Sequence, residues 1–319
     1  MTGAVPVLAG TSDAPWAFAA PWGARGYVTP LGGPVHWIEF GSAAAGPPLV
    51  FVHGLGGSHL NWVLVGPQLA ADRRVVALDL RGFGLTPGGR RTATVPGNAR
   101  MLDRFVREVA GAPVILVGNS MGGLLSILQA HDHPDTVAGL VLIDPALPQP
   151  FPQRPDLTVA SQFLLYALPG LGELSLKATR SLLPPRQEVQ RIIDLCFADP
   201  SRADPAVLAA GVALTEHRRS LPGRGESLLA AARSLMLVLA RPRRYWAMMA
   251  ALRVPVLLIG GEADRLTPVA SIRHASARNP NWDTVVLADV GHTPQLEAPR
   301  AVIGTVQGWL DRQVAGDAH

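Results

Sequence analysis

The chain has a single cysteine among its 319 residues, Cys196, so it cannot form an internal disulfide bond. Small secreted domains often depend on disulfides, whereas a lone thiol fits a reducing compartment. The chain also lacks the run of about 18 apolar residues that a membrane-spanning helix needs. Its first ten residues have no basic segment, and prolines and glycines interrupt the next stretch of the chain, so we expect no secretion signal. These absences favour a cytoplasmic protein with no stable membrane span.

Charge of either sign is scarce. Charged residues make up 16% of the chain, and the formal net charge is only +4. This small basic excess is spread along the sequence, so it gives no support for binding nucleic acid. Hydrophobic residues make up 48%, which excludes wholesale disorder and allows a substantial core.

Short apolar runs recur along the chain, each followed by a turn signal and a helical pattern. Uninterrupted Val, Ile and Leu residues are typical of strands that are buried on both faces of a sheet. Strands that alternate with helices indicate an α/β protein with a mostly parallel central sheet and helices on both faces. The predicted strands lie at 49–52, 74–79, 113–117, 140–144, 254–259 and 284–288, and a leading antiparallel hairpin is predicted from 26–28 and 35–39.

The alternation stops between residues 147 and 246. This region is rich in Leu, Ala, Arg and Pro and has helical periodicity without a convincing strand. We interpret it as a helical cap inserted between two strands of the sheet. A separate helical domain or a loose linker is the alternative, and the leucine content disfavours a linker. The predicted organisation is a core domain of residues 1–146 and 247–319 with a cap of residues 147–246.

The segment Gly118-Asn119-Ser120-Met121-Gly122 fits the pattern G-x-S-x-G, directly after a predicted strand and before a helical run. A sharp strand-to-helix turn exposes the serine hydroxyl, and small flanking residues relieve the crowding that such a turn causes. The helix also presents its N-terminus, so the Met121 amide can donate to a developing oxyanion. A simple turn without chemistry is the alternative reading of this pattern.

The loop His53-Gly54-Leu55-Gly56 follows an earlier buried strand. Its glycines let the backbone pass close to a ligand, and the Leu55 amide could be the second oxyanion donor. Glycine-rich loops can also hold phosphate. This loop lacks the Lys and Ser/Thr of a P-loop, and no G-x-G-x-x-G occurs in the chain, so nucleotide binding is disfavoured.

A serine nucleophile needs an imidazole to take its proton and a carboxylate to orient that imidazole. Asp264 stands in a loop after the strand predicted to end at residue 259, and His292 follows the last predicted strand. Both come after Ser120. The order serine, acid, histidine along the chain is the one found in enzymes whose nucleophilic serine lies on a strand-to-helix turn. Asp144 also ends a strand and is the alternative acid.

Together these segments resemble the α/β-hydrolase superfamily, from the leading hairpin to the last helix. The resemblance rests on the HG-x-G loop, the GNSMGG turn, the GEADRLTP loop and the GHTPQLE loop. It implies a catalytic triad of Ser120, Asp264 and His292 with Leu55 and Met121 as backbone oxyanion donors. Haloalkane dehalogenases and epoxide hydrolases have Asp in place of this serine, which disfavours both.

The resemblance implies a carboxylesterase or lipase type of enzyme that needs no metal or organic cofactor. We expect its partner to be a small ester or lipid-like molecule with an apolar acyl or alcohol part, while the oligomeric state stays open. GNSMGG also resembles the C–C bond hydrolases of aromatic ring-cleavage products. Those enzymes usually carry tryptophan after the catalytic histidine, where this chain has Thr293. A third possibility is a ligand-binding protein that keeps the fold without turnover.

Other polar residues receive a structural interpretation. Asp79 is predicted to anchor the loop 81–84 rather than to take part in chemistry. His131 and His133 are predicted to lie at a solvated helix end rather than in a zinc site, because alternate residues of a helix point to different sides. The arginines at 241, 243 and 244 are predicted to form a solvated hinge, with an acidic substrate or a membrane surface as the alternative.

Overall fold

The computed structural model describes residues 5–6, 18, 20–41, 46–111, 113–150, 156–220 and 224–316. Its centre is a nine-stranded sheet with the order β1-β2-β3-β5-β4-β6-β7-β8-β9. The strands are β1 (Val5–Pro6), β2 (Arg25–Pro30), β3 (Pro34–Gly41), β4 (Leu49–Val52), β5 (Val75–Leu78), β6 (Val114–Asn119), β7 (Val137–Ile143), β8 (Val256–Gly261) and β9 (Asp283–Leu287).

The pairing confirms the predicted mostly parallel sheet. β2 and β3 form an antiparallel hairpin, and β3 joins the rest by pairing antiparallel with β5. Every neighbouring pair from β5 through β4, β6, β7 and β8 to β9 is parallel. The two-residue strand β1 pairs antiparallel with β2 and was not predicted from the sequence pattern.

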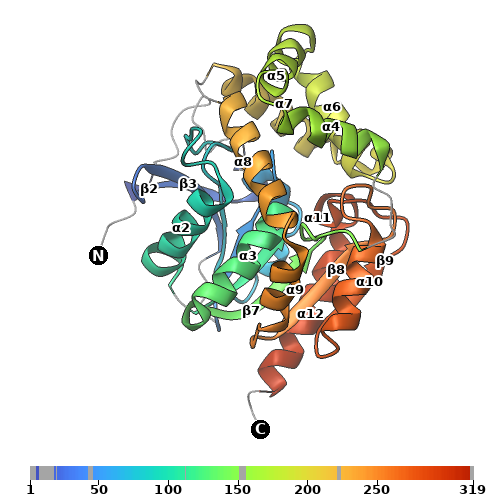
Figure 1. Cartoon of the computed structure of the whole chain (residues 1–319). Coiled ribbons are helices and arrows are strands. Elements are labelled where there is room, and N and C mark those ends of the chain that lie inside the picture. Colours follow the sequence, from blue (N-terminus) through green and yellow to red (C-terminus); the bar gives the residue numbers. More distant parts are fainter. Residues whose placement is uncertain are drawn as a thin grey trace.

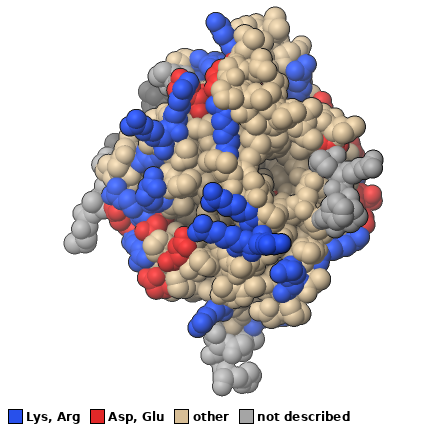
Figure 2. Space-filling view, in the orientation of Figure 1, with Lys and Arg blue, Asp and Glu red and all other residues tan. Residues whose placement is uncertain are grey.

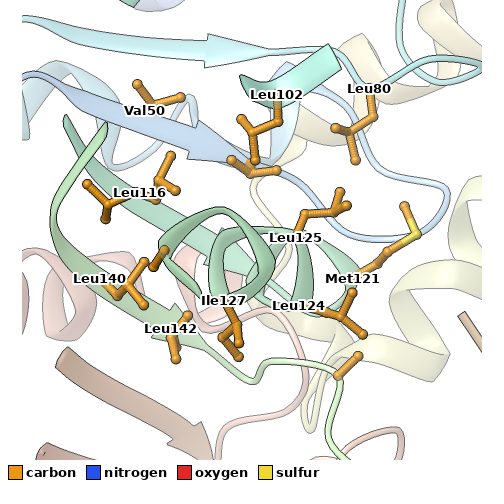
Figure 3. Close-up of a cluster of buried hydrophobic side chains, with 14 of the residues drawn as sticks. Val50, Leu80, Leu102, Leu116, Met121, Leu124, Leu125, Ile127, Leu140 and Leu142 are labelled. Carbon is orange, nitrogen blue, oxygen red and sulfur yellow. The ribbon is translucent and has the colours of Figure 1, made fainter. Parts of the chain in front are cut away.

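Each central strand supplies side chains to two hydrophobic cores because successive residues of a strand point to opposite faces. On β4, Val50 and Val52 belong to one core, while Leu49 and Phe51 belong to the other. Figure 3 shows the first core, where side chains of the helix that follows β6 lie over Val50, Leu116, Leu140 and Leu142 of three strands. The apolar runs of the sequence therefore fill both faces of the sheet.

The helices cover these two faces (Figure 1). α2, α3 and α9 pack together on one face, and α1 and α12 pack together on the other. Their bounds are α1 (Gly66–Leu69), α2 (Val95–Phe105), α3 (Met121–Asp132), α9 (Pro242–Ala250), α10 (Val269–Arg278), α11 (Pro294–Glu297) and α12 (Pro299–Gly316), with short helical turns η2 (Ala20–Trp22), η3 (His59–Trp62), η4 (Val106–Ala110), η5 (Pro134–Thr136) and η6 (Pro200–Arg202).

Helices also fill the described part of the chain between β7 and β8. Five of them precede α9. The first four lie above the carboxyl end of the sheet, at the top of Figure 1, and the fifth runs from them down to α2 and α9. α9 itself runs across the boundary expected at residue 246 and packs against α3. The five are α4 (Leu157–Ala167), α5 (Leu171–Leu182), α6 (Pro185–Cys196), α7 (Pro205–Arg219) and α8 (Arg224–Leu239). Within the described residues, no helix has the length and hydropathy required to cross a bilayer.

The strand order reverses at β4, which pairs with β5 on one side and β6 on the other. The loops that follow the neighbouring strands β4 and β6 therefore lead away in different directions and leave a crevice between them. Open α/β sheets place their ligand sites in crevices of this kind. The loop that begins with His53 follows β4, and Ser120 follows β6. The predicted site residues are therefore carried to one edge of the sheet.

Candidate active site

Ser120 occupies a strained turn between β6 and α3. Its φ of 55° and ψ of −120° lie in a region that L-residues rarely adopt. The turn requires glycines around it. A Cβ on Gly118 would lie 2.6 Å from the Gly122 carbonyl oxygen, and one on Gly122 would lie 2.0 Å from the Val52 carbonyl oxygen. The G-x-S-x-G pattern is therefore a steric requirement of this turn.

The loop after β4 lies against this turn. A Cβ on Gly54 would approach the Ser120 Cβ to 2.9 Å. The His53 ring holds the loop: its Nε2 accepts from the Leu80 amide at 3.0 Å, so Nδ1 carries the proton and donates to the Gly54 carbonyl at 2.7 Å. Burial lowers the pKa of His53 to about 4, so the ring is neutral at physiological pH.

The amides of Leu55 and Met121 are available to a ligand. The carbonyl and N–H groups of a trans peptide point in opposite directions, so fixing the Gly54 carbonyl on His53 turns the Leu55 N–H away from that ring. Met121 is the first residue of α3, where backbone donors have no partner within the helix. Within the described residues neither amide donates a hydrogen bond. Both can therefore serve as oxyanion donors.

His292 and Asp264 are paired. His292 Nδ1 lies 2.7 Å from Asp264 Oδ2, and both side chains are buried. The other carboxylate oxygen of Asp264 accepts from the amides of Leu266 and Thr267 at 2.7 and 3.1 Å. These bonds fix the carboxylate, which in turn orients the imidazole. No hydrogen bond joins Ser120 Oγ to His292 in the described part of the chain, and such bonds commonly tighten only when substrate is bound.

Asp144, the alternative acid, has a different role in this geometry. Its two carboxyl oxygens lie 2.9 and 3.1 Å from the Gly261 amide, and the side chain is fully buried. Burial, together with the charge of Asp264, raises the pKa of Asp144 well above its usual value. The neutral form of Asp144 is therefore favoured, and it is Asp264 that contacts the histidine.

The backbone of the histidine loop is held by residues that sequence reasoning missed. Asn119 Nδ2 donates to the His292 carbonyl at 3.0 Å, and the His292 amide donates to the Cys196 carbonyl at 2.6 Å. The buried carboxylate of Glu297 accepts from the Gly291 amide at 2.7 Å. Glu297 also accepts from the amides of residues 198 and 199 at 3.1 and 2.9 Å, so one side chain joins this loop to the segment after α6.

Cys196 contributes its backbone rather than its thiol. Desolvation raises the pKa of the thiol to about 12, so it stays protonated and is a poor nucleophile at neutral pH. The carbonyl of Cys196 packs against Gly291, where an added Cβ would lie 2.3 Å from the oxygen. The glycine before His292 was the only sequence signal for this close approach.

Ser120 and His292 open into one cavity of about 360 Å³. Its lining combines the core loops with residues of α4 to α8 and is mostly apolar, including Leu55, Phe83, Phe163 and Leu235. Figure 2 shows a hollow on the side of the molecule where these helices meet the core. Arg218 of α7 also lines the cavity, where it donates to the Gly82 carbonyl at 2.6 Å.

A second polar cluster lies outside this cavity. His36, His59 and Asp79 are buried and place possible metal ligands within 4.8 Å of one another. Their contacts are hydrogen bonds: Asp79 Oδ2 lies 2.8 Å from His36 Nδ1 and 2.9 Å from His59 Nδ1. Asp79 also accepts from the Leu85 amide at 2.8 Å, as expected of a residue that anchors this loop. These hydrogen bonds tie the cluster to the loop that follows β5, while His36 Nε2 and His59 Nε2 are buried without a hydrogen-bond partner in the described residues.

The interpretation of His131 can also be compared with the geometry. His131 is exposed and lies 2.7 Å from Asp132, in keeping with a solvated helix end. Trp62, on the short helical turn η3 after the loop that begins with His53, is fully buried and stacks on Phe51 with 4.7 Å between the ring centroids, so it packs in the core rather than in the cavity.

Comparison with known proteins agrees with this architecture. Residues 49–305 match the Alpha/beta hydrolase family. The chain is 31% identical over 272 residues to the dihydrolipoyllysine-residue acetyltransferase component of the acetoin cleaving system of Pseudomonas putida, covering 84% of this chain and 64% of that protein. The chain therefore spans less than two thirds of the length of that relative.

Solved structures share the fold at lower identity. The haloalkane dehalogenase DatA of Agrobacterium tumefaciens C58 superposes with a TM-score of 0.76 at 22% identity, covering 91% of this chain and 97% of that one. A thermophilic esterase of Thermogutta terrifontis gives 0.66 at 23% identity, covering 90% and 94%. The sheet and the elements around Ser120 define an α/β hydrolase. The chain belongs to the alpha/beta hydrolase family.

Proposed function

We propose that the chain is a serine hydrolase that cleaves carboxylic esters with an apolar acyl or alcohol part through an acyl-enzyme. The observation that carries this proposal is the strained Ser120 turn, which shares an apolar cavity with His292, and His292 is in turn hydrogen-bonded to Asp264. The fold alone does not select this chemistry, because the same architecture supports esterases and dehalogenases. Serine at position 120 favours acyl transfer.

The first half of the proposed reaction acylates the serine. His292 Nε2 takes the Ser120 proton while Oγ bonds to the substrate carbonyl carbon, and the amides of Leu55 and Met121 stabilise the resulting oxyanion. Asp264 accepts from His292 Nδ1–H and stabilises the imidazolium. The carbon–oxygen bond to the alcohol then breaks, and the leaving oxygen takes the proton from His292.

The second half releases the acid. His292 takes a proton from water, and the water oxygen bonds to the acyl carbon. The oxyanion again accepts from the two amides. Collapse breaks the bond to Ser120 Oγ, which recovers the proton from His292. Each cycle consumes one ester and one water and produces one alcohol and one carboxylic acid.

Residues 147–246 act in this proposal as a cap that shapes the acyl or alcohol pocket. Side chains from α4 to α8 form much of the cavity lining. A mostly apolar wall favours apolar groups because their burial removes hydrocarbon from water. In this proposal the longest acyl chain that the enzyme accepts is set by how far this apolar wall extends from Ser120.

A C–C bond hydrolase of ring-cleavage products is the second candidate. The buried Arg218 favours it, because such substrates carry a carboxylate and an arginine can bind one through two parallel hydrogen bonds. The Arg218 guanidinium carbon lies 6.0 Å from the Phe83 ring centroid, on the wall of the same cavity. A carboxylated substrate in this cavity would therefore meet an arginine.

The discriminating experiment compares p-nitrophenyl esters from acetate to palmitate with a chromogenic ring-cleavage product. We expect ester turnover that is lost in Ser120→Ala, with kcat/KM rising with acyl length until the cavity is filled. Turnover of the ring-cleavage product alone, with loss of activity in Arg218→Lys, would support the second candidate. Ligand binding without turnover, across the ester panel and the ring-cleavage product, would support a ligand-binding protein on this fold.

A further inference from the structure

The outer side of α4 and α5 exposes an unusual number of leucines. Soluble proteins rarely leave large apolar side chains clustered on the surface, and such patches mark interaction sites. Six leucines in the segment 157–182 are between 42% and 85% exposed, and elsewhere in the described chain exposed large apolar side chains are limited to Ile192 and Leu237. We name these six the α4–α5 surface: Leu157, Leu164, Leu168, Leu171, Leu174 and Leu182.

The spacing of these leucines gives each helix one apolar outer stripe. Leu157 and Leu164 are two helical turns apart on α4, and Leu171, Leu174 and Leu182 fall within one sector of α5. α4 and α5 pack against each other, so the two stripes belong to one helical hairpin.

The inner sides of the same two helices face the substrate cavity. Phe163 and Tyr166 of α4 and Leu176 of α5 line it together with Ser120. None of the six leucines lines the cavity. The hairpin therefore separates the cavity from an apolar outer surface, and a lipid held on the outside would lie one helix thickness from the pocket.

The charge on this hairpin identifies the partner. α4 carries no charged residue, and Glu173 of α5 is neutralised by two bonds to Arg233 at 2.9 and 3.1 Å. Lys177 of α5 and Arg186, in the first turn of the following helix α6, are exposed and form no ion pair within the described part of the chain. Figure 2 shows a broad area over these helices with few charged residues. A surface of leucines with free cations complements an anionic lipid interface.

We propose that the α4–α5 surface docks the protein on an anionic phospholipid surface. A second copy of the chain fits this surface poorly, because two such faces would bring their Lys177 side chains together, and Glu173, the acid of α5, is already bonded to Arg233. The further step, in which docking delivers a lipid substrate to the cavity, rests on the proposed function. Docking itself needs no turnover, so it is tested on the Ser120→Ala protein.

The experiment measures cosedimentation of Ser120→Ala protein with phosphatidylglycerol/phosphatidylcholine vesicles and with phosphatidylcholine vesicles. We expect binding to the anionic vesicles that weakens at high salt. Adding Leu164→Gln and Leu174→Gln should reduce the partition coefficient about tenfold or more, because two buried leucines are lost from the interface. Leu237→Gln is the matched control, an exposed leucine on α8 beside the arginines at 241–244, and it should leave binding unchanged.

A second readout uses the active protein. The same leucine pair should leave hydrolysis of a soluble short-chain ester unchanged but lower the rate on phospholipid-dispersed ester. Absence of vesicle binding, or an equal effect of Leu237→Gln, overturns the proposal. A dimer in light scattering that the leucine pair dissociates would overturn it in favour of self-association. Unchanged thermal unfolding of the variants shows that a loss of binding is not a loss of fold.

Discussion

Asp144, directly after β7, interacts with Asp264, in the loop after β8, and replacing each with asparagine should have opposite consequences. The neutral Asp144 already resembles asparagine, since burial and the charge of Asp264 raise its pKa. In Asp144→Asn the amide keeps an acceptor for the Gly261 N–H and a donor for the neighbouring carboxylate. We therefore expect kcat/KM within about fivefold of wild type. Asp264→Asn removes the charge that accepts from His292 and should lower kcat by about 10³ to 10⁴.

The Asp144→Asn substitution should also raise the free energy of unfolding, by an amount that depends on pH. A group whose pKa is raised on folding contributes stability that is present below its unfolded pKa and is lost as pH rises toward the folded pKa. Each pH unit above about 3.9 costs about 1.4 kcal/mol while Asp144 stays protonated, so the cost at pH 7 is at most about 4 kcal/mol. Asparagine cannot ionise in the unfolded chain, and Asp144→Asn should recover much of that loss.

Urea denaturation at pH 5, 7 and 9 measures this effect. We expect the difference in unfolding free energy between Asp144→Asn and wild type to grow from pH 5 to pH 7. A variant that is destabilised equally at all three pH values would refute the assignment of a neutral Asp144. A loss of kcat of about 100-fold or more, with Asp264→Asn remaining active, would make Asp144 the triad acid instead.

Three other substitutions test the parts around the triad. Glu297→Ala leaves backbone donors without their carboxylate and should lower the unfolding free energy by about 3 kcal/mol in urea melts; a loss below about 1 kcal/mol would show that water replaces it. His53→Ala frees the peptide that carries the Leu55 amide, so steady-state kinetics should show kcat falling about 10- to 100-fold with little change in KM; a pure KM effect would contradict the positioning role. Burial lowers the pKa of His36 in the folded protein. Its contribution to the free energy of unfolding should therefore be constant above about pH 6.5 and decrease as the pH drops below that value, where the histidine of the unfolded chain takes up a proton. His36→Asn retains a donor to Asp79, and its melting temperature should fall less between pH 6.5 and 5; an identical fall would assign the acid sensitivity elsewhere.

The sheet could be predicted because its signal is local. Strands that are buried on both faces consist of continuous Val, Ile and Leu residues. Each of the strands β4 to β9 overlaps a run of such residues that was predicted to be a strand. The short strand β1 carries no such run, and its pairing depends on β2. The cytoplasmic location and the cap assignment stay predictions, because they do not depend on strand pattern.

The polar contacts of the site were less predictable because they depend on long-range packing. The motif residues Ser120, Asp264 and His292 stand at strand ends and could be picked out one by one. Asp144 stayed an alternative to Asp264 because both residues follow strands, and which carboxylate reaches the imidazole depends on the packing of the loops. Glu297 likewise bonds an amide 99 residues away, which no spacing along the chain reveals.

Covalent labelling tests the central claim most directly. The protein is treated with a fluorophosphonate and examined by intact mass and peptide mapping, alongside Ser120→Ala and the matched control Ser126→Ala, a buried serine of α3. The account predicts one label per chain, located on Ser120, present in Ser126→Ala and absent from Ser120→Ala. A folded wild-type protein that takes no label, or one whose label survives in Ser120→Ala, would contradict it.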